Sequence, residues 1–369
     1  MRTGRRRPQS TCFKNTPIYL ACVRPPYSVS PKTTKRPTTT TPLRPSSQAS
    51  CQSLSTAMRL EAKLTHPIDQ SRFYKLRSKR KLAEVLCTNP QELKRTLRNA
   101  SYRISQTPKA DGTFRTIYNP NPSLKRVQHR IGNLLSRIEM PPWAFFARKG
   151  VCYVDNARYH EGARYLVKSD LSSFYDHCDR EHVYRFFKNT MKCSPDIAEA
   201  LCDLTTYTLQ DGSTIIPTGS PSAQIVAFLA YREMFDEIKA VADLYKCKFS
   251  LYVDDLTFSS RSGISNPSNL ERSISHIARQ YGHCIKAEKT VYLDASTSKI
   301  ITGVALTPSG EPKAPNALRE ATVSNLTQIS SGDLSKIVSC LGRINAAQMI
   351  ERNLFADSKR QVEQILASA

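Results

Sequence analysis

The sequence has no long apolar run and comparatively few acidic residues. No stretch approaches the roughly 18 apolar residues of a membrane-spanning helix, so we expect no membrane partner beyond peripheral contact. Asp and Glu number 31 against 54 Lys and Arg, which leaves a net charge of +23. An excess this large favours a polyanionic partner over a merely soluble basic protein, and nucleic acid is the first candidate.

Paired Cys-X-X-Cys spacings are also absent. The 11 cysteines are scattered along the 369 residues and show no disulfide-framework spacing. We therefore expect reduced thiols, mostly packing residues, in a cytoplasmic protein without structural zinc. The length allows a large core and two or three subdomains.

The first 57 residues contain no Asp or Glu. They combine a basic run at Arg5–Arg7 and a threonine run at Thr38–Thr41 with frequent Pro and Ser, a composition that cannot supply a packed core. We expect residues 1–57 to be a disordered basic extension. Three interpretations stay open: an untranslated stretch upstream of a start at Met58, a flexible arm for nucleic acid, or an organelle transit peptide.

Three aspartates stand at the ends of predicted strands. The stretch FSLYVDDLTFSS (249–260) alternates apolar and polar residues before Asp254 and Asp255, which predicts a hairpin with both carboxylates at its turn. A second predicted strand begins at Tyr165 and ends at Asp170. Each aspartate alone is equally typical of an ordinary surface turn. Together, three carboxylates supply the oxygen ligands that hard divalent cations prefer.

Basic and glycine-containing segments accompany these carboxylates. KADGTFRTIYNP (109–120) predicts a hairpin that turns at Asp111-Gly112, and Pro122 opens an amphipathic helix. Arg115 on the hairpin and Lys125 on the helix are candidates for phosphate contacts, with a solvated basic face as the alternative. IPTGSPSAQ (216–224) leads into an uncharged helix, and Gly219 allows close approach of the backbone to a ligand.

In this order the segments resemble a reverse transcriptase, and more narrowly the bacterial retron type. The general motifs are FRTIYNP, DLSSFYDH, IPTGSPSAQ, YVDDLTFS and AEKT, and the similarity runs from about Ser71 to the C-terminus. Two segments narrow the resemblance to retrons. DNARYH (155–160) fits the retron NAxxH pattern, and ITGVALT (301–307) is similar to the retron VTG motif with Ile in place of Val.

The resemblance implies an α+β fold, the right-hand polymerase with fingers, palm and thumb. We expect N-terminal helices and fingers over residues 58–165, and the basic stretch SRFYKLRSKRKLAEVL predicts a helix from about Ser71. The palm, an antiparallel sheet backed by helices, carries the catalytic site over residues 166–305, with some fingers elements interleaved. A helical, RNA-binding thumb follows over residues 306–369.

The resemblance also implies roles for individual residues. Asp170, Asp254 and Asp255 correspond to ligands of two Mg²⁺ ions that align the attacking hydroxyl with the α-phosphate. Lys289 of AEKT matches a lysine proposed as general acid near the pyrophosphate, with a surface lysine as the alternative. Tyr175, five residues after Asp170, matches the steric gate that selects deoxynucleotides, with a core aromatic as the alternative.

Further contacts follow from the same comparison. Arg115, assisted by Lys109, matches the fingers residue that grips the incoming dNTP. Thr218 replaces a glutamine that many relatives carry before Gly219, which leaves only a backbone contact expected there. The expected RNA-binding residues are Asn156, His160, Lys125 and Arg343.

Finally, the resemblance implies a template and partners. Retron enzymes copy a cognate structured noncoding RNA from a guanosine 2′-hydroxyl into branched msDNA, and they act in antiphage defence with a separate effector protein. Two alternatives remain. Another prokaryotic reverse transcriptase, of group II intron or diversity-generating type, is disfavoured by DNARYH and ITGVALT and by the lack of a maturase or endonuclease extension. An inactive RNA-binding scaffold is disfavoured by the three intact aspartates.

Overall fold

The computed structural model describes residues 65–109, 112–148 and 150–368. The expected basic extension over residues 1–57, the Met58 start and the turn residue Asp111 lie outside the described residues. The chain divides into two compact units, one formed by Met1–Ala62 with Gln106–Arg115 and the other by Lys63–Ser105 with Thr116–Ala369.

A four-stranded antiparallel sheet forms the centre of the larger unit. Its strands are β6 (Lys248–Tyr252), β7 (Asp255–Ser260), β3 (Tyr165–Asp170) and β8 (Val291–Leu293), in the order β6-β7-β3-β8. The register pairs Asp170 with Asp255. The alternating hairpin expected at YVDD is therefore confirmed, and its turn lies beside the end of β3.

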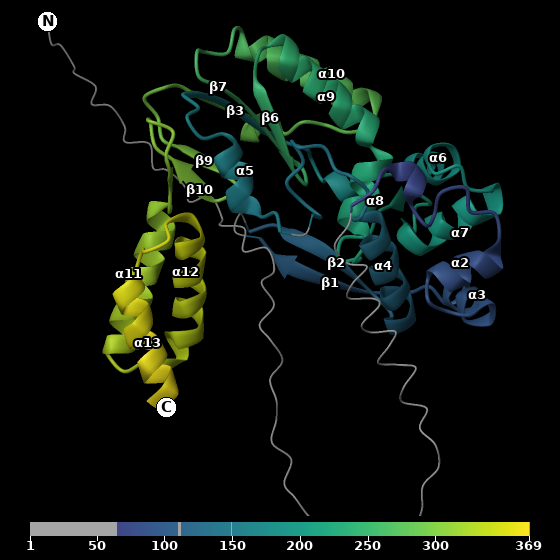
Figure 1. Ribbon diagram of the computed structural model, residues 1–369, viewed down its shortest axis with the longest axis horizontal. Helices are drawn as coiled ribbons and strands as arrows, with labels where there is room; N and C mark the ends of the chain where they lie inside the picture. The colour runs from purple at the N-terminus through teal and green to yellow at the C-terminus, as the bar shows by residue number, and fades with distance from the viewer. Residues whose placement is uncertain (1–64, 110–111, 149, 369) are drawn as a thin grey trace, which may run out of the picture. The chain divides into compact units, whose positions relative to one another are not determined.

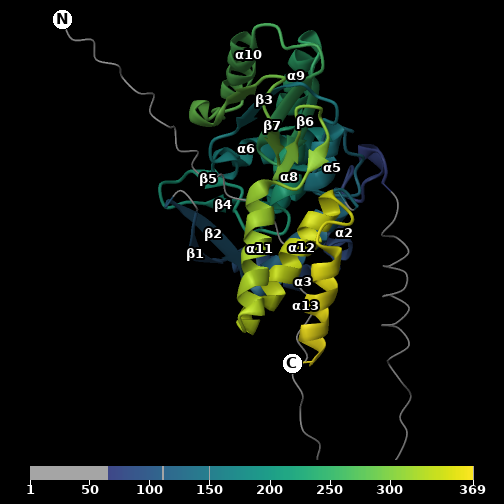
Figure 2. The ribbon, with the colours of Figure 1, turned by 90° about the vertical axis from the view of Figure 1, so that its left-hand side faces the viewer.

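Helices pack against this sheet to make the main core. They are α4 (Pro122–Leu135), α8 (Ala223–Ala230), α9 (Arg232–Leu244) and α10 (Pro267–Gln280). α9 and α10 lie side by side in both views (Figures 1 and 2). The expected helix at Pro122 is confirmed: the Asn121 side chain caps it by accepting a hydrogen bond from Leu124 N at 3.0 Å.

Shorter elements surround this centre. They are α2 (Lys79–Val85), α3 (Pro90–Arg98), α6 (Arg180–Arg185) and α7 (Pro195–Thr205), with the hairpin strands β1 (Tyr102–Pro108), β2 (Phe114–Pro120), β4 (Tyr207–Thr208) and β5 (Thr214–Ile215). The helix expected from about Ser71 begins only at Lys79. The segment before Lys79 instead forms backbone hydrogen bonds with residues far along the chain: Lys75 N donates to Met191 O at 2.8 Å, and Leu76 O accepts from Ser194 N at 3.0 Å.

The last third of the described chain contains a small sheet and three helices. The sheet has the order β11-β10-β9, from β9 (Lys299–Ile301), β10 (Val304–Leu306) and β11 (Pro312–Lys313). The helices α11 (Asn316–Ser330), α12 (Ile337–Ile350) and α13 (Ala356–Ser368) pack along one another (Figure 1). The short α5 (Tyr153–Tyr159) shares a hydrophobic cluster with β10 and α12.

The described cysteines are free thiols, as expected. Five are buried, namely Cys178, Cys193, Cys202, Cys247 and Cys340, whereas Cys87 and Cys284 are exposed. Burial raises the pKa of the Cys193 and Cys247 thiols to about 11, so these groups stay protonated. Among the residues described, no helix combines the length and apolar character needed to cross a bilayer.

Candidate active site

The backbone brings the three predicted aspartates to one end of the central sheet. Asp170 is the last residue of β3 and pairs with Asp255, the first residue of β7, while Asp254 lies in the β6–β7 turn. Val253 enters that turn with φ +63°, and Leu171 N donates to Asp254 O at 3.1 Å. The turn is thus bonded to the chain that follows Asp170.

Burial makes the charge on Asp254 and Asp255 unfavourable. The pKa of Asp254 is raised to about 7, chiefly by burial and further by the neighbouring carboxylates of Asp170 and Asp255. Burial also raises the pKa of Asp255, against the attraction of Lys168, whose Nζ lies 3.6 Å from Asp255 Oδ1. Carboxylates held together in a desolvated place are stabilised by a bound cation, and such perturbed groups mark candidate functional sites.

Two lysines form ion pairs with the carboxylate of Asp170. Lys286 Nζ lies 2.9 Å and Lys289 Nζ 3.1 Å from Asp170 Oδ2. Lys289 was predicted, whereas Lys286 was missed. The signal for Lys286 was its spacing, because residues three apart eclipse one another around a 3₁₀ turn, here Ala287–Lys289.

The donor chemistry of this site fits a hard divalent cation. Its three candidate ligands are carboxylates, the type that Mg²⁺ prefers. Within the part of the chain that the structure describes, no three His, Cys, Asp or Glu side chains are grouped closely enough to hold an ion as they stand. The ammonium groups of Lys286 and Lys289 instead provide the positive charge beside Asp170.

Tyr175 remains partly accessible beside this site. It lies in the 3₁₀ turn Phe174–His177 that follows β3, and its carbonyl accepts a hydrogen bond from Ile216 N at 3.2 Å. The neighbouring Phe174 is buried in the core, whereas Tyr175 is only half-buried. Of the two rings, Tyr175 is therefore the one able to meet a substrate, and its steric-gate role stays a prediction.

The Thr218-Gly219 loop packs on β2 rather than standing open. Tyr118 N donates to Thr218 O at 2.7 Å. Gly219 has φ +106°, and a Cβ there would meet Ile117 Cγ2 and Tyr118 O at 3.0 Å. The close approach that requires this glycine is thus made to the protein itself, and the expected backbone contact with a nucleotide stays a prediction.

The remaining basic candidates lie on separate elements. Lys109 and Arg115 are exposed on the β1–β2 hairpin, whose tip belongs to the other unit, so their action on a triphosphate stays a prediction. Lys125 lies in the first turn of α4. Arg343 on α12 donates a hydrogen bond to Ser339 Oγ. Contacts of Lys125 and Arg343 with RNA also stay predictions.

Asn156 and His160 require a correction, because both side chains are buried inside the protein. His160 is 0% exposed, and its Nδ1 and Nε2 each lie 2.7 Å from a serine hydroxyl, of Ser259 and Ser250 respectively. Asn156 is 1% exposed and donates to Thr302 Oγ1 at 3.3 Å. Direct RNA binding by these two side chains was expected, but here they bind other parts of the chain.

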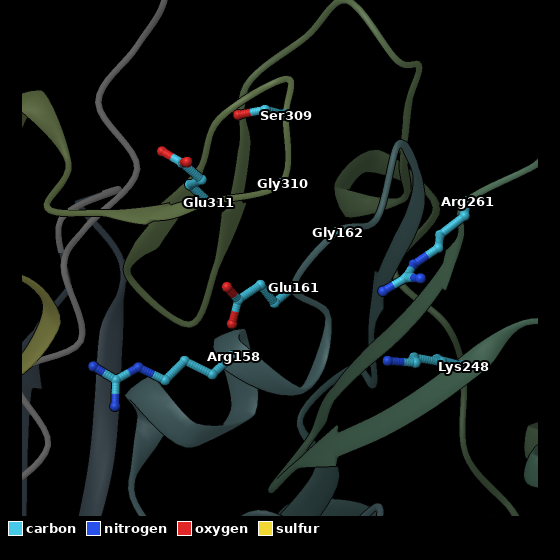
Figure 3. A pocket seen from close by; sticks show the side chains of 8 residues that line it. All are labelled: Arg158, Glu161, Gly162, Lys248, Arg261, Ser309, Gly310 and Glu311. Carbon is cyan, nitrogen blue, oxygen red and sulfur yellow. The ribbon is translucent and has the colours of Figure 1, made fainter.

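The exposed side of α5 borders a charged cavity of about 480 Å³ (Figure 3). Arg158 and Glu161 line it together with Lys248, Arg261 and the turn Ser309–Glu311. Lys248 and Arg261 extend toward it from the strand side in Figure 3. The sequence did not reveal this cavity, because its walls come from segments far apart in the chain.

Comparison with known proteins agrees with this geometry. The family model described as reverse transcriptase (RNA-dependent DNA polymerase) matches residues 107–306. The retron Ec48 reverse transcriptase of Escherichia coli is 23% identical over 311 residues, which cover 77% of this chain and 75% of that protein. The retron Ec83 reverse transcriptase of the same species is 23% identical over 64% of this chain and 78% of its own length.

A solved structure of Candida albicans telomerase, in complex with a fragment of telomeric RNA, is also similar. It shows a TM-score of 0.43 and 11% identity over 73% of this chain and 58% of that one. The retron relatives confirm the resemblance drawn from DNARYH and ITGVALT, and the family match confirms the right-hand polymerase fold. Because the matched region covers more than half of its residues, the chain belongs to the reverse transcriptase (RNA-dependent DNA polymerase) family.

Proposed function

We propose that this RNA-directed DNA polymerase serves a retron, copying a cognate structured noncoding RNA from a guanosine 2′-hydroxyl into branched msDNA. Its biological setting is antiphage defence beside a separate effector protein. The proposed catalytic mechanism rests on one observation: Asp170, Asp254 and Asp255 lie together at one end of the sheet. The retron relatives support the choice of template and product.

Asp170, Asp254 and Asp255 hold the metal in this proposal. Two bound Mg²⁺ ions supply activation of the attacking hydroxyl and neutralisation of the charge that develops on the phosphates. Asp170 and Asp254 would be the main ligands, with Asp255 beside them. The raised pKa of Asp254 supports this role, because a cation there relieves the repulsion between its carboxylate and its neighbours.

The surrounding residues orient the substrates. Lys289 has a half-exposed side chain whose Nζ reaches the site, and it delivers its proton to the departing pyrophosphate. The ring of Tyr175 excludes a ribose 2′-hydroxyl from the incoming dNTP. Arg115 and Lys109 bind the triphosphate. Lys125 and Arg343 bind RNA phosphates, and helices α11 to α13 act as the thumb.

A double substitution tests the catalytic assignment. Asp254→Asn with Asp255→Asn removes two metal-binding carboxylates but keeps side chains of the same size. We expect DNA synthesis on an RNA template to fall to background while RNA affinity stays within about twofold, since phosphate contacts dominate that affinity. Primer extension and a binding titration measure the two quantities. Asp357→Asn, on α13 with an 85% exposed side chain, is the control and stays fully active.

Normal synthesis by the double variant would refute the site. The retron part is tested separately, by sequencing the nucleic acid that copurifies with the wild-type protein. We expect DNA joined to one RNA species through a 2′-linked guanosine. Copurified DNA without any attached ribonucleotide would contradict the branched product.

A further inference from the structure

The two segments that resemble retron motifs are bonded to each other. Asn156 of DNARYH donates from Nδ2 to Thr302 Oγ1 of ITGVALT at 3.3 Å, across 146 positions of sequence. Thr302 Oγ1 in turn donates to Tyr153 O at 2.8 Å. One hydroxyl therefore connects the side chain and the backbone of α5 to the β9–β10 turn.

The backbone of that turn explains why the connection is needed. Thr302 and Gly303 join β9 to β10 as a two-residue hairpin turn, and both have positive φ, +45° and +86°. Such a turn matches the twist of the strands, but a β-branched residue adopts this conformation only at a cost. The two hydrogen bonds of the Thr302 hydroxyl offset that cost and fix the hairpin on α5.

The other end of α5 is bonded to the strands of the catalytic hairpin. The ring of His160, the residue that caps α5, lies between Ser250 of β6 and Ser259 of β7. Burial lowers the pKa of His160 to about 3, so the ring is neutral and has one donor and one acceptor nitrogen. It therefore accepts from one serine and donates to the other.

The last turn of α5 also contacts the C-terminal helix α12. Arg158 NH2 donates to Met349 O at 3.3 Å and to Ile350 O at 3.4 Å, the last carbonyls of α12. A cation at this end of a helix satisfies carbonyls that have no partner within the helix. In about two turns, α5 thus bonds to the catalytic strands, the β9–β10 hairpin and α12.

We propose that α5 is a positioning element that fixes the thumb helices relative to the catalytic hairpin and so determines how far the enzyme copies before it releases its template. The residues that act are Asn156 through Thr302, Arg158 through α12, and His160 through the two serines. None of them contacts the reacting atoms. The proposal rests on the proposed function, since it requires the thumb to hold the copied duplex.

A double-mutant cycle on the Asn156–Thr302 contact tests the proposed role of α5. Asn156→Ala, Thr302→Val and the double variant are compared for product length in a single binding event and for the rate of single-nucleotide addition. We expect each single variant to shorten products about fivefold, the factor that corresponds to one net hydrogen bond. The rate of single-nucleotide addition stays within about twofold, because the chemistry at Asp254 is untouched.

The double variant is then no worse than the poorer single variant, because both changes break the same contact. Thr302→Ser keeps the hydroxyl and restores wild-type product length. Thr205→Val is the matched control: its buried hydroxyl bonds Leu201 O within α7, away from the thumb, so product length is unchanged. Effects of Asn156→Ala and Thr302→Val that simply multiply, or an equal fall in the addition rate, would overturn the proposal.

A substitution at the protein surface provides a second test, which remains valid if the substitutions at Asn156 and Thr302 prevent folding. Arg158→Gln removes the contact with α12 from an exposed position, and it too should shorten products while the addition rate stays constant. Wild-type product length in Arg158→Gln would refute the role of α5. A failure of the proposed function is distinguishable, because it would show in the wild-type protein itself, as copurified DNA without an attached ribonucleotide, whatever the product lengths of the variants.

Discussion

Asp254 is a residue at which the folded protein disfavours a negative charge. Its pKa of about 7 lies above that of an aspartate in an unfolded chain, because burial and the carboxylates of Asp170 and Asp255 disfavour ionisation. A raised carboxyl pKa contributes stability that is present below about pH 4 and is lost as pH rises through 7. The metal-free protein is therefore weakened at neutral pH by a residue to which we assign a metal-binding role.

Asp254→Asn should remove that weakness. We expect the metal-free variant to be more stable than wild type at pH 8, by up to roughly 4 kcal/mol, and equally stable at pH 4, where wild-type Asp254 is protonated. Urea unfolding in the presence of a chelator measures the free energy at both pH values. The exposed Asp357→Asn should show no pH-dependent difference from wild type. A gain of the same size at pH 4 and pH 8 would mean that charge is not the cause.

Tyr175 permits a second test at the scale of one side chain. Tyr175→Ala should raise ribonucleotide incorporation relative to deoxynucleotide on the order of tenfold, because removing the ring makes room for a 2′-hydroxyl. The ratio of the two kcat/KM values measures this selectivity. Tyr292→Ala, which removes an exposed ring from β8, serves as control. If the ratio is unchanged in Tyr175→Ala, the ring only packs against the core.

At the scale of elements, the sequence correctly predicted those helices and strands that are determined by residues close together in the chain. The YVDD hairpin and the helix after Asn121 were correct, because alternation and capping act over a few positions. The helix expected from Ser71 was wrong, since Phe73 and Leu76 are buried and the intervening Lys75 is bonded to Met191, more than a hundred residues away. Contacts at that distance leave no local pattern.

The candidate site shows the same difference between what local patterns predict and what distant contacts determine. Asp170, Asp254 and Asp255 were predicted because they stand at the ends of predicted strands, and a motif then implied that they meet. Asn156 and His160 were assigned to RNA because a motif marks positions and says nothing of the direction in which a side chain points. Their burial depends on serines of β6 and β7 and on a threonine of the β9–β10 turn, which no spacing within DNARYH reveals.

At the scale of the whole molecule, charge is the property to test. Deleting residues 1–57 removes ten basic residues and no acidic residue, which lowers the net charge from +23 to +13. We expect a protein that starts at Met58 to keep full msDNA yield and an unchanged dependence of log affinity on log salt. RNA-binding titrations over a salt series, with full-length protein alongside, measure this slope.

A shallower slope would show that the segment binds RNA. Each phosphate that it neutralised would account for a change of roughly 0.7 to 0.9 in the slope. Loss of msDNA yield together with a shallower slope would establish the segment as a nucleic-acid arm, and our expectation would be wrong.

The exposed thiol of Cys284 offers a way to observe this enzyme at work. Its backbone carbonyl accepts a hydrogen bond from Ser172 N at 2.7 Å, two residues after Asp170, and its side chain is open to solvent. A maleimide dye reacts with accessible thiols before buried ones whose pKa is raised. In a Met58-start protein that also carries Cys87→Ser and Cys152→Ser, a dye on Cys284 would stand at the edge of the candidate active site. Its fluorescence would then report the arrival of each substrate in real time.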